Sequence, residues 1–106
     1  MNKTYKVVWL PEALNGLKDI FEFIKKDSQQ AAIKVSQKIL SKAKSLKKEP
    51  QIHAIENYLE SEKGDFRFVV VYSYKVIFEI EDNSVVILDI FHTSRNPVEI
   101  SKPQKK

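Results

Sequence analysis

The chain has 106 residues, a net charge of +4 at pH 7 and no cysteine. This length favours one domain with a hydrophobic core, and the 42% hydrophobic fraction excludes an intrinsically disordered chain. The lack of cysteine excludes disulfide frameworks and thiolate metal sites, and the two histidines form no spaced metal motif. We therefore expect no metal or cofactor. Without a membrane-length apolar run or a signal peptide, we expect a cytoplasmic protein with one domain over residues 1–100 and a flexible basic tail over residues 101–106.

The first predicted elements are a strand and two helices. Residues 4–9 are mostly β-branched or aromatic, which is typical of a strand. Pro11 suits the first turn of a helix, and the apolar residues after it recur at three- and four-residue spacing. Asp27-Ser28 supply an N-cap for a second amphipathic helix, which stops before Pro50. Two helices joined by such a short break predict an antiparallel helix hairpin.

The second half of the chain predicts a meander of three strands. Residues 51–64 have scattered apolar side chains, so we expect a loop that holds at most one short strand. Strands are predicted over residues 66–72, 74–81 and 85–92, with turns at Ser73 and at residues 82–84. In the middle strand one alternate set of side chains is apolar. The other set, which includes Lys75 and Glu79, is expected to face mainly solvent.

The last predicted strand is apolar on both faces, so we expect it to be central in the sheet or covered by a partner. By strand alternation, His92 has the same parity as Val86, Leu88 and Ile90. Strands joined by tight turns must be antiparallel. The predicted fold class is α+β, with the order β-α-α-β-β-β and an antiparallel sheet with a helix hairpin packed on one face.

Basic residues are unevenly distributed. Between Ser28 and Lys48 there are several lysines and no acidic residue. A basic surface attracts phosphate backbones and also acidic protein segments. The alternative is a helix face that is only solvated, as most lysine-rich helix faces are. We predict partner or nucleic-acid contacts at five positions: Lys34, Lys38, Lys42, Lys63 and Lys75. For Lys63 and Lys75 the alternative is a plain surface charge.

The chain resembles toxins of the RelE/ParE superfamily in its predicted order of strand, two helices and meander, and in three segments: PEALNGLKDIFEFI, FRFVVVYSYKVIFEI and VVILDIFHTSRNP. The resemblance covers the chain from Tyr5 to about Pro97. It implies the toxin of a bacterial type II toxin–antitoxin pair, of the plasmid-stabilisation kind, which inhibits growth and is neutralised by a cognate antitoxin. Such toxins either bind DNA gyrase or cleave mRNA on the ribosome without a metal. An inactive toxin fold that serves as a binding module is a third alternative.

Cleavage of mRNA needs a base, an acid and cations that stabilise the charge on the phosphate. The candidate catalytic residues are Arg67, His92 and Arg95. Arg67 and His92 match positions that the resemblance marks as functional in the nuclease branch, and Arg95 lies just past the end of the last strand. The alternatives are an exposed strand arginine and a histidine whose ring nitrogens are merely satisfied. Nuclease members often carry arginine where Asp89 stands, and the FHTSRNP ending looks closer to the ParE-like branch. We therefore expect gyrase binding, with endonuclease activity as the alternative, and no role for His53.

Overall fold

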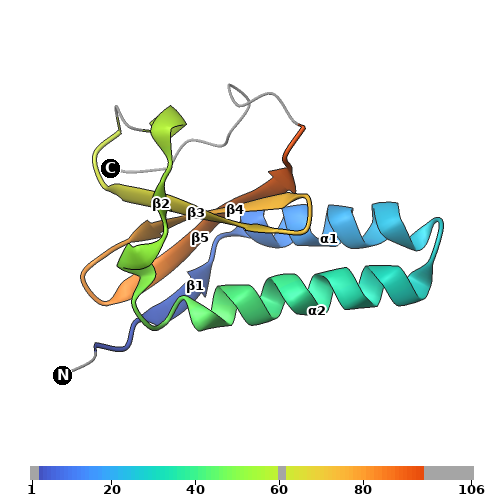
Figure 1. Ribbon diagram of the computed structural model, residues 1–106, viewed down its shortest axis with the longest axis horizontal. Coiled ribbons are helices and arrows are strands. Elements are labelled where there is room, and N and C mark those ends of the chain that lie inside the picture. The colour runs from blue at the N-terminus through green and yellow to red at the C-terminus, as the bar shows by residue number, and fades with distance from the viewer. Residues whose placement is uncertain (1–2, 60–61, 95–106) are drawn as a thin grey trace.

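The computed structural model describes residues 3–59 and 62–94 (Figure 1). Two helices and a five-stranded sheet follow in the order β1 (Lys6–Trp9), α1 (Pro11–Lys25), α2 (Gln29–Ser45), β2 (Ala54–Ile55), β3 (Asp65–Val71), β4 (Tyr74–Ile80) and β5 (Ser84–His92). Two 3-10 turns, Pro50–Ile52 and Asn57–Leu59, flank β2. The helix hairpin packs on one face of the sheet (Figure 1). The predicted α+β fold is confirmed, and the short strand expected between residues 51 and 64 is β2.

The sheet is mixed, because β1 pairs in parallel with β5. The strand order is β1-β5-β4-β3-β2, and the other neighbouring pairs are antiparallel. The expectation of an antiparallel sheet therefore holds for β2 to β5 and not for β1. Tight turns fix the direction only of the strands that they join, and the helix hairpin separates β1 from the meander. As expected, β5 is central, between β1 and β4.

Local signals determine where the helices begin. Pro11 is the first residue of α1, where its missing N–H leaves no hydrogen bond unmade. Ser28 caps α2, because its side chain accepts a hydrogen bond from the N–H of Ala31. Small and large apolar residues alternate on the buried faces of the two helices, which lets them pack closely on each other and on the sheet: Ala13 and Ile20 in α1, and Ala32, Ile39 and Ala43 in α2.

The outer face of the sheet, opposite the helices, is also covered. Ile77 and Glu79 of β4 are only 0% and 3% exposed, so the prediction that their side of β4 faces solvent is wrong. Leu59, from the second 3-10 turn, packs there with side chains of β3 and β5 in a second hydrophobic cluster. The segment between α2 and β3 therefore completes a core on the outer face, although its sequence shows no regular apolar pattern.

A β-bulge reverses the direction of side chains within β5. The register between β4 and β5 shifts by one residue, and Leu88 is the extra residue. Val86 and Leu88 therefore pack in the outer cluster, while Ile90 packs on the side of the helices. The prediction that these residues share one face with His92 holds for Ile90 and is wrong for Val86 and Leu88, because strand alternation is broken at the bulge. His92 lies beyond it and borders α1.

Candidate functional site

The end of β5 presents His92 in a defined orientation. His92 pairs with Tyr74 of β4, and the two rings meet edge to face with centroids 5.4 Å apart. Ser94 contacts the imidazole twice, since its backbone N–H donates to Nδ1 at 3.1 Å and its Oγ lies 2.8 Å from the same nitrogen. Because Nδ1 accepts a hydrogen bond from the backbone, the proton of the neutral ring lies on Nε2. The exposed edge of the imidazole is therefore a hydrogen-bond donor.

His92 borders a groove of about 670 Å³ between α1 and the end of β5. Its described lining combines aromatic and aliphatic side chains with three carboxylates and contains neither lysine nor arginine; it consists of Glu12, Asn15, Gly16, Asp19, Ile20, Phe23, Tyr74, Asp89, Ile90, Phe91, His92 and Ser94. Asp89 is buried, and its Oδ1 accepts the N–H of Ile90 at 2.9 Å. Phe23 is 67% exposed at the surface of α1. We call this feature the α1–β5 groove.

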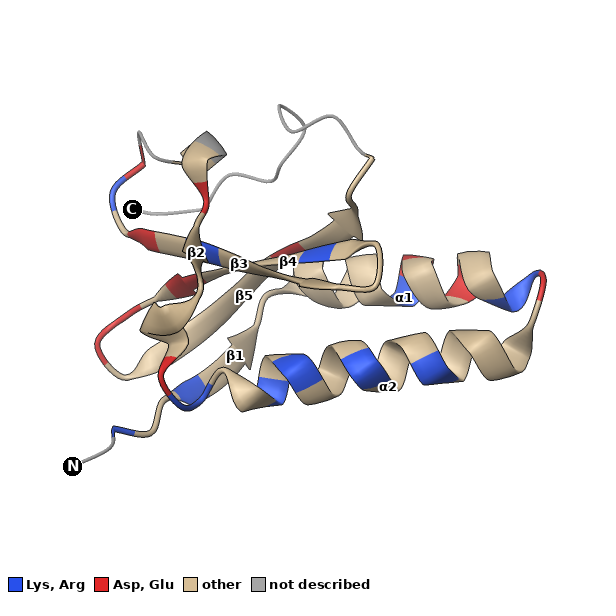
Figure 2. Ribbon diagram, viewed as in Figure 1, with Lys and Arg blue, Asp and Glu red and all other residues tan. Residues whose placement is uncertain are grey.

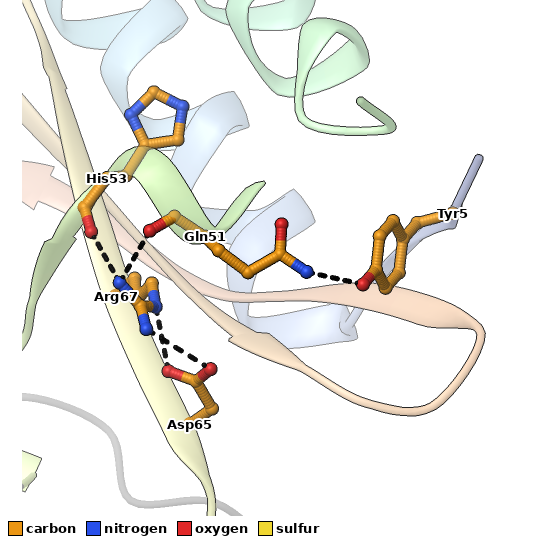
Figure 3. A network of polar contacts seen from close by, with 5 residues as sticks. All are labelled: Tyr5, Gln51, His53, Asp65 and Arg67. Atoms are coloured by element: carbon orange, nitrogen blue, oxygen red, sulfur yellow. Dashed lines mark hydrogen bonds and ion pairs between the residues drawn. The ribbon is translucent and has the colours of Figure 1, made fainter. Parts of the chain in front are cut away.

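Arg67 lies on β3, where it joins the preceding loop to the sheet (Figure 3). Its Nε donates to Oδ1 of Asp65 at 2.8 Å, and its Nη1 donates to the carbonyl oxygens of Gln51 and His53 at 2.8 and 2.9 Å. Gln51 in turn donates to the hydroxyl of Tyr5 at 2.5 Å. The Arg67 side chain is only 18% exposed. Through these contacts the guanidinium joins the segment before β3 to the sheet, which is a structural role.

The structure does not bring Arg67 and His92 together. Arg67 pairs with Phe78 of β4, whereas His92 pairs with Tyr74 of the same strand. Four residues along β4 correspond to about 13 Å, and β3 and β5 lie on opposite sides of β4, about 10 Å apart. The third predicted catalytic residue, Arg95, and the predicted basic tail lie outside the described residues.

The predicted lysines of α2 lie on one surface. Lys34, Lys38 and Lys42 are exposed and follow one another at four-residue spacing, which places them along one side of the helix. Figure 2 shows basic residues along α2 and no acidic residue on it. Lys63 is exposed in the turn before β3. These four positions are accessible to a partner, and their roles stay predictions.

Lys75 differs from the other predicted lysines. Its Nζ lies 2.5 Å from Oε1 of Glu56, a buried residue of the segment between α2 and β3. The same Nζ lies 4.3 Å from the centroid of the Phe68 ring. Lys75 is therefore neither a plain surface charge nor an accessible partner contact. The sequence could not predict this pairing, because nothing in an irregular segment indicates that Glu56 will be buried next to β4.

His53, for which the sequence predicted no role, lies between the helices and the Arg67 network. Its ring meets Phe78 edge to face, with centroids 6.0 Å apart. Burial, together with the positive charges of Lys42 and Arg67, lowers the pKa of His53 below its ordinary value of 6.5. These neighbours come from α2 and β3, so only the folded chain reveals the effect.

Within residues 3–59 and 62–94, no group of three or more histidine or acidic side chains is placed to hold a metal ion. None of the helices in this part of the chain has the length and apolar character needed to cross a membrane.

Comparison with known proteins gives a family and a fold. The family model described as "ParE toxin of type II toxin-antitoxin system, parDE" matches residues 7–97. A chain from a structure titled "Chromosomal ParDE TA system from P. aeruginosa" has a similar fold, with a TM-score of 0.68 and 18% sequence identity, over 84% of this chain and 96% of that chain. No curated protein sequence matches. Because the family model spans most of the chain, this protein belongs to the ParE family of toxins of type II toxin–antitoxin systems.

Proposed function

We propose that this toxin inhibits growth by binding DNA gyrase, that it does not cleave mRNA, and that a cognate antitoxin neutralises it. The observation that supports binding over cleavage is the separation of Arg67 from His92. An acid, a base and a phosphate-binding cation must all reach the same phosphodiester. Here the guanidinium of Arg67 is held by Asp65 and two carbonyl groups, away from the imidazole.

The charge of the α1–β5 groove supports the same conclusion. Phosphate next to His92 would meet the carboxylates of Glu12 and Asp19 on α1, and no described lysine or arginine lines the groove. Carboxylates close to a phosphate raise the energy of the bound state. The apolar part of the groove instead suits a protein side chain. Phe23 is an exposed aromatic residue of the kind that is enriched at protein interfaces.

The acid-free surface of α2 supports the antitoxin part of the proposal. Lys34, Lys38 and Lys42 would attract an acidic antitoxin and increase its rate of association. We expect that changing these three lysines to glutamate slows association and weakens its dependence on salt. Stopped-flow measurements with the antitoxin at low and high salt would test this. An unchanged association rate at low salt would mean that these lysines are only solvated.

The experiment that tests the target combines two assays on one protein preparation. Supercoiling of relaxed plasmid by purified gyrase should fall as the toxin is added, while mRNA on translating ribosomes stays intact. Phe23→Ala should weaken gyrase inhibition, whereas Leu14→Ala, which also removes an exposed apolar side chain from α1 but lies outside the groove, should not. Cut mRNA with unaffected supercoiling would favour the endonuclease. Normal growth of expressing cells would favour the inactive binding module.

A further inference from the structure

The outer edge of β3 is paired over only part of its length. β2 pairs with β3 at Arg67 and Phe68 alone. Before β2, the chain forms the 3-10 turn Pro50–Ile52, which is not a strand. In the part of the chain that the structure describes, no strand lies beside residues 69–71 on this side. An open sheet edge is a template for another strand, and proteins normally cover it or block it.

The backbone groups at this edge face outward. The carbonyl of Phe66 accepts a hydrogen bond from the N–H of Glu56, on the side of β2. Because alternate residues of a strand direct their N–H and C=O groups to the same side, Phe68 and Val70 direct theirs outward as well. Val70 therefore presents one donor and one acceptor to the space next to β2. Its side chain is 49% exposed, although valine is apolar.

The turn after β3 adds a second unusual feature. Tyr72 has a φ of 55°, in the left-handed region that favours glycine, and its side chain is 53% exposed. A bulky residue in this conformation costs of the order of 1 kcal/mol or more, and such strain often accompanies a functional surface. Tyr72 and Val70 together form an apolar surface at the open edge.

A groove of about 440 Å³ runs between this edge and α2. Its lining on the α2 side consists of basic and hydroxyl side chains, and its lining on the β3 side is apolar: Lys38, Ser41, Lys42 and Ser45 from α2, Val70 and Val71 from β3, and Tyr72 from the turn after β3. The helix carries no acidic residue to neutralise these lysines (Figure 2). Backbone hydrogen-bonding groups, apolar surface and positive charge thus meet in one groove.

We propose that this groove binds an extended, acidic segment of a protein partner, which joins the sheet as an additional strand beside Val70. Alternate side chains of the added strand would point toward α2, where acidic residues meet Lys38 and Lys42. The side chains between them would lie on the outer face beside Phe68 and Val70, where apolar residues fit. The groove thus selects a segment in which acidic and apolar residues alternate. A second copy of the toxin is a poor occupant, because it would bring two lysine-lined surfaces together.

The inference rests on the proposed function, because a toxin that acts by contact and is neutralised by contact needs such surfaces. Partner binding is measured without gyrase, so its result is separate from the supercoiling assay that tests the proposed target. The probe is a short fluorescent peptide in which glutamate and valine alternate, and binding is measured by anisotropy at low salt. A control peptide has the same composition, with the glutamates and valines in separate blocks. We expect the alternating peptide to bind about tenfold more tightly, because only it can match both faces of an added strand.

Two pairs of variants separate the backbone contribution from the charge contribution. Val70→Pro removes the outward N–H and should weaken peptide binding about tenfold, while Val70→Thr keeps that N–H and the branched shape and should not. The double variant Lys38→Glu and Lys42→Glu should weaken binding at low salt. Its control, with Lys18→Glu and Lys25→Glu, reverses two exposed charges on α1.

Circular dichroism and thermal unfolding must show that each variant folds. If Val70→Pro unfolds, an alternating peptide with N-methylated amides tests the same hydrogen bonds on the unmodified toxin, and it should fail to bind. Equal binding of the alternating and block peptides would overturn strand addition. So would tight binding of single-stranded oligothymidylate without binding of the alternating peptide, which would mark a nucleic-acid surface. Peptide binding by a toxin that leaves gyrase active would overturn only the proposed target.

Discussion

Gly16 of α1 and Ile90 of β5 approach so closely that a Cβ at Gly16 would lie 2.7 Å from the carbonyl oxygen of Ile90. This distance is shorter than carbon and oxygen tolerate, and both the helix and the central strand are regular elements that resist a shift. The absence of a side chain at position 16 therefore determines how closely α1 approaches the sheet. It also shapes the α1–β5 groove, which Gly16 lines.

We expect Gly16→Ala to destabilise the protein. In a helix interior, alanine is intrinsically more favourable than glycine by about 1 kcal/mol. Overpacking against the carbonyl should outweigh this gain, with a net loss of about 1–2 kcal/mol in the free energy of unfolding. Urea unfolding measures the change, and Asn15→Ala, an exposed substitution one residue earlier in α1, is the matched control. A Gly16→Ala variant at least as stable as the wild type would contradict the prediction, and a gain of about 1 kcal/mol would show that α1 moves without cost.

Arg67 gives a second prediction about stability. Arg67→Met should lower the free energy of unfolding by about 1–3 kcal/mol, because the carbonyls of Gln51 and His53 lose a charged donor. Arg67→Lys should recover only part of this loss, since an ammonium lacks the planar fork that reaches both carbonyls and Asp65. Chemical unfolding of both variants and of Lys63→Met, at an exposed lysine, provides the measurement. If Arg67→Met matched the control, the guanidinium would be free for another role.

The regular elements could be predicted because their apolar patterns are strong. The helices follow from Pro11, Ser28 and the three- and four-residue spacing, and the meander follows from strands separated by short turns. The direction of β1 could not be predicted, because no tight turn connects it to a neighbouring strand. The bulge at Leu88 is also invisible in the sequence, since β5 is apolar on both faces and a one-residue shift leaves that pattern unchanged.

The site was harder to predict than the fold, for a related reason. Gln51 and His53, which bond to Arg67, and Glu56, which pairs with Lys75, come from the segment between α2 and β3. This segment forms 3-10 turns and a two-residue strand, and its apolar residues have no regular spacing. From the sequence, Glu56 in such a segment would be predicted to be a surface charge, yet it is buried against β4. By contrast, His92 and the lysines of α2 were located correctly at the end of a strand and on a helix surface, because both positions follow from regular structure.

His53 should make stability depend on pH. Its pKa is lowered in the folded state by burial and by Lys42 and Arg67, so the unfolded chain binds a proton more readily. The stability that neutral His53 supports is therefore fully present above about pH 6.5 and is lost as the pH falls toward the folded pKa. The free energy of unfolding of the wild type should decrease over this range more than that of His53→Gln. Lys42→Met should reduce the slope by removing one of the charges that lower the pKa.

Urea unfolding at several pH values between about 5 and about 8 checks this prediction. The wild type and His53→Gln differ only at position 53, so the difference between their curves reports on that side chain. Parallel curves for the wild type and His53→Gln would mean that the imidazole titrates alike in the folded and unfolded chains.

The last prediction concerns His92, which the two remaining modes of action use differently. If the toxin binds its target, His92→Gln should reduce growth inhibition only mildly, since glutamine can still donate a hydrogen bond into the groove. If it cleaves RNA, the same change should lower the cleavage rate by about two to four orders of magnitude, because an amide cannot transfer protons as an imidazole does.

Arg95→Ala should then distinguish the cases further, since loss of a charge-assisted contact weakens a binding toxin more than the loss of His92 does. Growth arrest at matched expression, measured with the thermal stability of each variant, gives the answer. Full toxicity of both variants at wild-type stability would assign the His92–Ser94 contact to structure alone, and a loss of activity with His92→Gln far greater than with Arg95→Ala would contradict the binding mechanism.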